Sequence, residues 1–247
     1  QVVEQVEDKK YVLIIDEINR GNVSSIFGEL ITLIEEDKRQ GKREALEVIL
    51  PNSKDKFGVP QDLYIIGTMN TADRSVEALD AALRRRFNFI EMPPRYDLAE
   101  LKYEYEGIIV SDILRTINTR IEKLLDKDHQ IGHSYFILGE NETAEGKLIN
   151  SFFNSIIPLL QEYFYGDYGK IGLVLGMGFV IKKRWNIDLD NFAKLEAYGS
   201  SDFDDRDVFG LVDYRDIKAT HKIASEGNAF IKDFKNAINM LMNKSLG

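Results

Sequence analysis

Hydrophobic residues in the first part of the chain form short continuous runs separated by segments of helical periodicity. Such runs are typical of parallel strands buried on both faces, and they occur at 11–15 (YVLII), 63–67 (LYIIG) and 87–92 (FNFIEM). Apolar spacing predicts a helix over 23–37, with Asn22 as its N-cap, and a shorter helix over 75–86. The segment ALEVIL (45–50) is consistent with one arm of an inserted hairpin. This alternation indicates an α/β layer with a mostly parallel sheet.

After Pro94 the pattern changes to longer helical segments. Periodic apolar residues predict helices over 97–127, 147–165 and 225–242. We expect a kink at Pro158, and the glycine-interrupted run at 171–181 (IGLVLGMGFVI) predicts one or two short strands. The expected domains are an α/β part over 1–94, a mostly helical part over 95–181 and a C-terminal extension over 182–247.

Polar residues follow the predicted strands at their carboxyl ends, where open α/β sheets place their ligands. Asp16 and Glu17 end the first strand. Two carboxylates held at a sheet edge suit phosphoryl transfer, in which one helps to hold Mg²⁺ and the other orients the attacking water. Many buried strands nevertheless end in an acidic residue that only caps the next turn, and for this pair alone the structural interpretation is favoured.

The second polar segment, TMNTADRS (68–75), follows the second strand directly. Asn70 at a strand end can bind a water or a phosphate oxygen from a fixed position, and Asp73 and Arg74 can pair to brace its loop. An Asx-turn leading into a helix capped by Ser75 explains the same residues equally well.

The third polar segment is the run of three arginines at 84–86, at the end of a predicted helix. The helix dipole alone favours basic residues there. The functional interpretation is that some of these arginines reach the γ-phosphate held by a neighbouring subunit and stabilise the charge of the transition state. The three polar segments together, in this order at consecutive elements, favour a nucleotide site.

At this point the sequence resembles a known family, the McrB-like AAA+ GTPases. VLIIDEINRGN resembles an extended Walker B segment, GTMNTADRS the family's sensor signature, ALRRRF its arginine-finger segment and QIGHSYF a part of its helical lid. The resemblance covers roughly residues 11–165, and MNTADRS is close to family-specific. It implies a partial AAA+ P-loop NTPase core, followed by a mostly helical lid and a C-terminal extension that ends in an amphipathic helix.

The resemblance also implies roles for individual residues. Asp16 would serve Mg²⁺, Glu17 would polarise the hydrolytic water and Asn70 would help to position that water. Asp73 and Arg74 would brace the Asn70 loop and contact the adjacent subunit. The arginines that matter at the subunit interface would be Arg85 and Arg86, and the residues of the lid near the nucleotide would be His133 and Ser134.

The activity implied by the resemblance is that of a motor subunit that hydrolyses GTP with Mg²⁺. The implied partners are further copies of the chain in a homo-oligomeric ring, a hexamer, and an McrC-like endonuclease that acts on modified DNA. One alternative is an ATP-dependent remodeller of the MoxR type. Another is a non-hydrolysing assembly module that contributes its arginines in trans.

The 247 residues contain no Walker A motif, G-x-x-x-x-G-K-[ST]. The P-loop supplies most of the phosphate contacts through backbone N–H groups and its lysine. We therefore interpret the chain as the later part of an AAA+ module and expect it to be inactive by itself. We also expect the strands at 63–67 and 87–92 to lack the P-loop strand that lies between them in this fold.

The amino-acid composition further narrows the classes of protein to which the chain could belong. Hydrophobic residues make up 44% and charged residues 30% of the chain, a balance that supports a real core. The net charge of −9 means that DNA contact would need a local basic patch or another subunit. The absence of cysteine excludes disulfides and thiolate metal sites. No apolar run reaches the ~20 residues of a membrane span, and the polar start does not resemble a secretory signal, so we expect a cytoplasmic protein.

Overall fold

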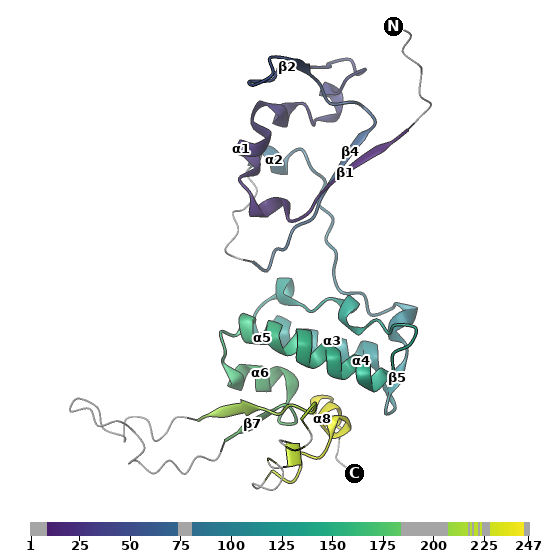
Figure 1. Cartoon of the computed structure of the whole chain (residues 1–247), viewed down its shortest axis with the longest axis vertical. Helices are drawn as coiled ribbons and strands as arrows, with labels where there is room; N and C mark the ends of the chain where they lie inside the picture. The colour runs from purple at the N-terminus through teal and green to yellow at the C-terminus, as the bar shows by residue number, and fades with distance from the viewer. Residues whose placement is uncertain are drawn as a thin grey trace, which may run out of the picture. The chain divides into compact units, whose positions relative to one another are not determined.

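A computed structural model describes residues 9–73, 81–183, 207–216 and 228–244, together with 218, 220, 221 and 223. The backbone separates into two compact units, Gln1–Glu91 and Met92–Gly247. Each unit has its own hydrophobic core, and we describe each by itself (Figure 1).

The first unit is organised around a pair of parallel strands. β1 (Tyr11–Ile15) pairs with β4 (Leu63–Gly67) in a register that joins Tyr11 to Leu63 and Ile15 to Gly67. Both strands were expected at these bounds. Because the pairing is parallel and in step, the carboxyl ends of both strands reach the same edge of the sheet. The predicted α/β fold class is confirmed.

Short helices and a hairpin connect these strands. The segment after β1 forms a 3-10 helix (Ile18–Arg20), α1 (Val23–Phe27) and 3-10 helices at Gly28–Thr32 and Glu36–Lys38. Asn22 caps α1 as expected, since its Oδ1 accepts a hydrogen bond from the Ser25 N–H at 2.9 Å. The single helix predicted over 23–37 is wrong, because Gly28 adopts a left-handed φ of 50° that ends the α-helix.

The insertion before β4 contains the expected hairpin, with β2 (Val48–Ile49) antiparallel to β3 (Lys56–Phe57). After β4, α2 (Ala81–Arg84) forms part of the helix predicted over 75–86, and residues 75–80 of that prediction lie outside the described residues.

The third predicted strand, 87–92, does not form. Phe87 packs against the core of the first unit, but the later apolar side chains are left in solvent, with Ile90 81% and Met92 86% exposed. A strand needs a neighbour for its backbone N–H and C=O groups, and within the described part of the chain no segment pairs with this one. The hydrophobic run therefore predicts a buried segment, but the described residues supply no partner strand that would bury it.

The second unit begins with a 3-10 helix (Ala99–Leu101) and a hairpin of β5 (Glu104–Tyr105) and β6 (Ile108–Ile109). α3 (Val110–Leu124) follows the hairpin directly, so the helix predicted over 97–127 is correct only in its second half. The apolar face of α3 is completely buried and comprises Ile113, Leu114, Ile117 and Ile121. Two 3-10 helices come next, at Lys127–His129 and His133–Phe136.

The helix predicted over 147–165 runs from 144 to 163 in three parts. α4 (Ala144–Ser151) passes into a π-helix (Phe152–Ile156), and α5 (Ile157–Tyr163) continues the chain. Pro158 stands in the first turn of α5, where its missing N–H removes a bond to the preceding turn. The π-helix immediately before it is the local distortion that the proline predicts.

The strands predicted over 171–181 are correct only at the end of the segment. Residues up to Leu175 form α6 (Tyr168–Leu175), because Asp167 caps its first turn by accepting from the Lys170 N–H at 3.1 Å. Gly176, with a φ of 88°, ends the helix. β7 (Val180–Lys182) then pairs antiparallel with β8 (Phe209–Leu211).

Of the terminal helix predicted over 225–242, residues 225–227 lie outside the described residues and the described part is helical only near its end. α8 (Phe234–Leu241) begins only after Asp233, whose carboxylate accepts from the Asn236 N–H at 2.7 Å and fixes the first turn. The buried side chains of α8 are Phe234, Ala237, Ile238 and Leu241.

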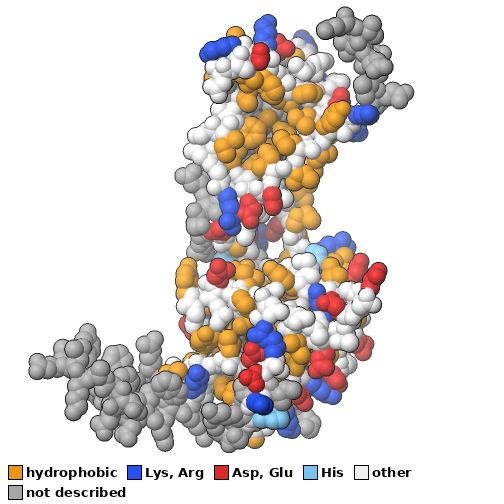
Figure 2. Space-filling model, viewed as in Figure 1, with side chains coloured by type: hydrophobic (Ala, Val, Ile, Leu, Met, Phe, Trp, Pro, Cys, Tyr) orange, Lys and Arg blue, Asp and Glu red, His pale blue; other side chains and the backbone are white. Residues whose placement is uncertain are grey.

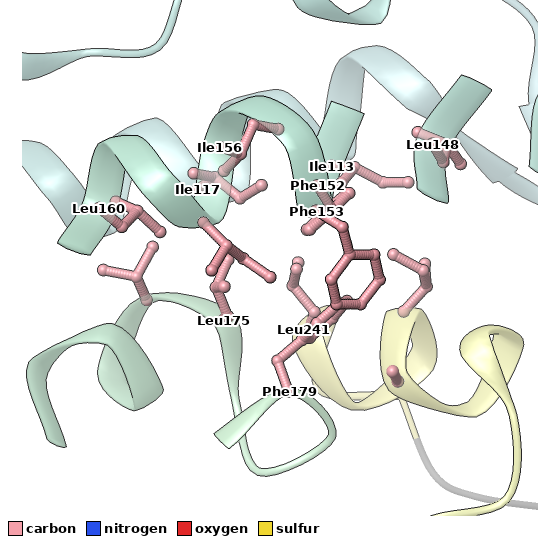
Figure 3. Packing of buried hydrophobic residues seen from close by; sticks show 14 of the residues in the cluster. Ile113, Ile117, Leu148, Phe152, Phe153, Ile156, Leu160, Leu175, Phe179 and Leu241 are labelled. Carbon is pink, nitrogen blue, oxygen red and sulfur yellow. The ribbon is translucent and has the colours of Figure 1, made fainter. Parts of the chain in front are cut away.

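α3, α4, the π-helix, α5, α6 and α8 share one core (Figure 3). Phe152 of the π-helix stacks on Phe179 with ring centroids 5.0 Å apart, and Phe234 of α8 meets Phe152 edge-on at 5.8 Å. The C-terminal helix is therefore packed into the same core as the central helix α3.

Replacing Ile117 with alanine is expected to destabilise the second unit by about 2–5 kcal/mol, because its side chain is fully buried on α3 and its loss leaves a cavity. Urea unfolding followed by circular dichroism measures the change. Lys123→Ala, at an exposed position of the same helix, is the control and should stay within about 0.5 kcal/mol of the unaltered chain. Equal losses for both variants would show that α3 is not packed as described.

Candidate functional site

The polar groups that follow β1 and β4 are joined by the side chain of Thr68. Its hydroxyl donates to the carboxylate of Asp16 and accepts from the backbone N–H of Glu17 at 2.9 Å. The backbone continues the connection, since the Ile18 N–H donates to the Thr68 carbonyl at 2.9 Å. Thr68 therefore fixes the orientation of the Asp16 carboxylate at the sheet edge.

Glu17 has an unusual backbone for a residue with a side chain. Its φ of 49° and ψ of 51° lie in the left-handed region, which costs an L-residue roughly 1–3 kcal/mol. The bond from its N–H to Thr68 helps to hold this conformation. The bend turns the chain sharply after β1, so that Glu17 leaves the strand direction and its carboxylate pairs with Arg20.

The loop that contains Asn70 is held to the segment after β1. The Oδ1 of Asn70 accepts from the Ala72 N–H at 3.0 Å, which is the predicted Asx-turn. The carbonyl of Asn70 accepts from the side-chain amide of Asn19 at 3.2 Å. Further along the loop, Asp73 lies 3.7 Å from the guanidinium of Arg20.

The structure thus brings Asp16, Glu17, Asn70 and Asp73 together, through contacts made by three residues that the sequence analysis did not single out: Asn19, Arg20 and Thr68. The available signal was their place in DEINR and GTMN, directly beside the residues that were chosen. Arg74, the remaining candidate of this loop, lies outside the described residues.

The arginine run has a different environment for each residue. Arg86 is 18% exposed, and its Nη2 lies 2.6 Å from Oε1 of Glu35. The guanidinium of Arg84 lies 5.5 Å from the centre of the Phe89 ring. Arg85 is exposed. Arg86 is therefore braced within this unit, and the side chain of Arg85 is accessible for a contact outside it.

A cavity of about 580 Å³ lies next to Arg86, but it is not at the carboxyl edge. Its lining includes Asp62 and Tyr64, at the start of β4, together with Arg39 and Lys42. Neither Asp16 nor Thr68 contributes to it. The cavity is therefore separate from the carboxyl edge of the sheet, where the sequence predicted the ligand to bind.

His133 and Ser134 belong to the second unit, in the 3-10 helix His133–Phe136. The Nδ1 of His133 accepts from the backbone N–H of Arg95 at 3.2 Å, and Ser134 is exposed.

The groups available for a metal ion are few. Within the described residues no three His, Asp or Glu side chains gather closely enough to hold an ion by themselves. The edge of the sheet does offer one carboxylate, Asp16, at a fixed orientation beside the Thr68 hydroxyl. This donor set fits Mg²⁺ bound with nucleotide phosphates, because Mg²⁺ keeps several waters and takes only one or two protein oxygens.

Comparisons with known proteins agree with both units. Residues 1–87 match the family described as AAA domain (dynein-related subfamily), and residues 109–172 match McrB, alpha-helical lid domain. The described part of the chain has no helix long and apolar enough to cross a membrane.

Two curated proteins of restriction systems are similar to the chain. The Type IV methyl-directed restriction enzyme EcoKMcrB subunit of Escherichia coli (strain K12) is 39% identical over 181 residues, which is 68% of this chain and 39% of that protein. The Type II restriction enzyme BsuMI component YdiS of Bacillus subtilis (strain 168) is 29% identical over 171 residues, 62% of this chain and 48% of that protein. The chain thus spans less than half the length of either relative.

Proposed function

The chain belongs to the McrB-like AAA+ family, and from this we propose that it forms the Walker B, sensor and arginine-finger part of a nucleoside-triphosphatase in a restriction system. The observation that carries the proposal is the Thr68 connection, which joins the Asp16 carboxylate and the Glu17 backbone to the end of β4, from which the Asn70 loop starts. Phosphoryl transfer depends mainly on such positioning and on charge stabilisation.

In the proposed site each residue has a separate task. Asp16 would hold Mg²⁺ through its oriented carboxylate, and the ion would supply positive charge that offsets the charge of the phosphates. Glu17 orients and deprotonates the attacking water, for which its carboxylate must leave Arg20. Asn70 uses its side-chain amide group to fix the same water, since its Oδ1 is engaged within the loop. Asp73 and Arg74 brace this loop toward the adjacent subunit.

The roles that we propose for Arg85 and Arg86 follow from their different environments. Arg85, which is exposed, reaches the triphosphate of a neighbouring copy and stabilises transition-state charge. Arg86 contributes from its pairing with Glu35, which orients the end of α2. Because the Arg85 contact joins neighbouring copies, we also propose that the chain assembles into a ring-shaped homo-oligomer, a hexamer. In the second unit, His133 and Ser134 lie in a lid near the nucleotide.

A P-loop has to accompany these residues, since the 247 residues contain none. The strands β1 and β4 support this, because both remain open: Ile14 is 66% and Ile66 is 51% exposed. Hydrophobic side chains are exposed together on this unit in Figure 2. A P-loop strand beside β4 would pair with the edge of β4, and helices packed on the sheet would cover these side chains. We call the assembly in which a P-loop accompanies these residues the complete NTPase.

The chain by itself is expected to show no steady hydrolysis of GTP or ATP with Mg²⁺, because the phosphates lack the P-loop amides and lysine. A phosphate-release assay on the purified chain tests this, and the same assay on the complete NTPase is the positive control. If the chain alone shows sustained turnover and Glu17→Gln does not change it, the proposed site is excluded. If the chain alone shows sustained turnover and Glu17→Gln abolishes it, only the requirement for a P-loop is excluded.

We propose GTP as the substrate and an McrC-like endonuclease as the partner that acts on modified DNA. The support is the similarity to a subunit whose name describes a methyl-directed restriction enzyme. The match to the dynein-related AAA subfamily favours a second candidate, an ATP-driven remodeller of the MoxR type. Turnover of GTP and ATP compared at equal concentration on the complete NTPase separates the two: a preference for ATP supports the remodeller.

A further inference from the structure

Glu17 has a left-handed backbone at a position where this conformation is unusual. Its φ is 49° and its ψ is 51°. The other described residues that carry a side chain and have a positive φ lie in hairpin turns or within two residues of a helix end, where this conformation is common: Lys54, Glu106, Tyr165 and Asn243. Glu17 instead precedes a 3-10 helix, a position at which the backbone is usually extended. The bend at Glu17 therefore costs free energy and needs contacts that hold it.

The contacts that hold the bend come from Thr68, at the end of β4. The Oγ1 of Thr68 accepts from the Glu17 N–H at 2.9 Å and donates to the Asp16 carboxylate. The backbone of Thr68 makes two further bonds, because its carbonyl accepts from the Ile18 N–H at 2.9 Å and its N–H donates to the Ile15 carbonyl at 3.0 Å. Most residues at position 68 could make the two backbone bonds, but the bond to Glu17 needs a hydroxyl.

The hydrogen of this hydroxyl has one possible direction. The Glu17 N–H can only donate, so it uses a lone pair of Oγ1. An ionised carboxylate can only accept, so the hydrogen points to Asp16. The hydroxyl thus joins the side chain of one carboxylate residue to the backbone of the next, and valine, which has nearly the same shape as threonine, makes neither bond.

Removal of the hydroxyl should change the position of Glu17 more than the stability of the fold. Thr68 and Asp16 are both exposed, so water can take over their hydrogen bonds. Water does not fix the Glu17 N–H in one direction, however. Without the hydroxyl the backbone of Glu17 is free to return to the extended region, which is lower in energy for a residue with a side chain. Its carboxylate would then leave the chain at a different point and in a different direction.

We propose that Thr68 is a positioning residue that acts through Glu17. Its hydroxyl holds the left-handed bend from which the Glu17 carboxylate is aimed at the attacking water. The task of Glu17 rests on the proposed function, whereas the bend and its contacts are properties of the chain itself. Thr68 touches neither the water nor the nucleotide in this proposal.

The bend is tested on the chain as it is, by NMR. The carbon shifts of Glu17 report its backbone conformation, and the exchange rate of its amide hydrogen reports the bond to Thr68. Thr68→Val and Thr68→Ala, which both lack the hydroxyl, should speed this exchange about tenfold, as expected for one lost hydrogen bond, and should move the carbon shifts toward extended values. Thr68→Ser, which keeps the hydroxyl, should leave both unchanged.

The amide of Ile18 is the internal control, because it is bonded to the backbone of Thr68 and should exchange at its normal rate in all three variants. Unchanged shifts and exchange of Glu17 in the variants without the hydroxyl would overturn the proposal. Equal acceleration at Glu17 and Ile18 would overturn it as well, since the hydroxyl would then support the whole segment and not the bend.

Action through Glu17 is tested on the complete NTPase with GTP. Thr68→Val should lower kcat about 10–100-fold, the cost of a misplaced catalytic group, and leave the dissociation constant of the nucleotide within about twofold. In the Glu17→Gln background the same substitution should change kcat by less than about twofold, because Thr68 then has no catalytic group to position. Thr32→Val, which removes a threonine hydroxyl elsewhere in the first unit, is the control and should turn over normally.

The outcomes separate this inference from the proposed function. If Thr68→Val lowers kcat by its full factor in the Glu17→Gln background as well, Thr68 acts independently of Glu17 and the inference fails alone. If Glu17→Gln by itself retains normal turnover, the proposed function fails, and the inference fails with it.

Discussion

Glu17→Gln in the complete NTPase is expected to lower kcat by roughly 10²–10⁴-fold while nucleotide still binds. Glutamine keeps the size of the side chain and a hydrogen-bonding oxygen, but it cannot accept the proton of the attacking water. Binding is retained because the phosphates are held by the P-loop and by Mg²⁺ at Asp16, not by Glu17. Phosphate release measures turnover, and titration with a fluorescent nucleotide measures binding.

Glu47→Gln is the matched control for this variant, because Glu47 is an exposed glutamate in the segment that leads into β2. It should retain normal turnover and normal affinity. Normal turnover in Glu17→Gln would remove Glu17 from the catalytic step. A loss of binding equal to the loss of turnover would instead make Glu17 a structural residue of the bend after β1.

Arg85→Ala is expected to lower turnover of the assembled ring by roughly 10³–10⁵-fold, the range found for arginine fingers. The guanidinium acts on charge that develops in the transition state, so substrate affinity should change much less than kcat. Because Arg85 is exposed, the free energy of unfolding of the isolated chain should stay within about 0.5 kcal/mol of its normal value.

Arg43→Ala, an exposed arginine between the Glu36–Lys38 helix and β2, is the control for removing a surface guanidinium. It should hydrolyse nucleotide normally. If Arg85→Ala keeps full activity and Arg86→Ala loses it without unfolding, the transition-state contact belongs to Arg86, and its pairing with Glu35 would have to open during turnover.

The sequence correctly predicted the strands whose pairing partners lie within the chain. The runs at 11–15 and 63–67 form β1 and β4 at the expected bounds, because each has the other as a parallel neighbour. The run at 87–92 has the same hydrophobic character but forms no strand. The hydrophobicity of a segment predicts that it will be buried, but it does not identify the segment that pairs with it.

The other errors have local causes. Gly28 interrupts a helix whose apolar spacing is otherwise continuous, since spacing does not report a left-handed φ. The run at 171–175 forms α6, since a short apolar run fits a buried helix as well as a strand, and the cap at Asp167 decides between them. Both outcomes depend on single residues at element ends, where patterns of hydrophobicity carry least information.

For the site, the motifs identified Asp16, Glu17, Asn70 and Asp73, and the structure brings these residues together. Their connection through Thr68 and Arg20 was not predicted, because it depends on the register of β1 with β4 and on the bend at Glu17. The same is true of Asn118, which from the sequence is one polar residue on a helix and in the structure holds the backbone of Ile131.

The central claim is that Glu17 of one subunit and Arg85 of its neighbour act on the same triphosphate. It is tested by mixing Glu17→Gln and Arg85→Ala subunits of the complete NTPase, each inactive alone, and measuring phosphate release after exchange. An interface between an Arg85→Ala subunit and a following Glu17→Gln subunit contains an intact copy of both residues, so equal mixing should restore up to about a quarter of normal turnover. If the subunits mix fully and turnover stays at the level of the separate variants, the two residues do not share a site between neighbours.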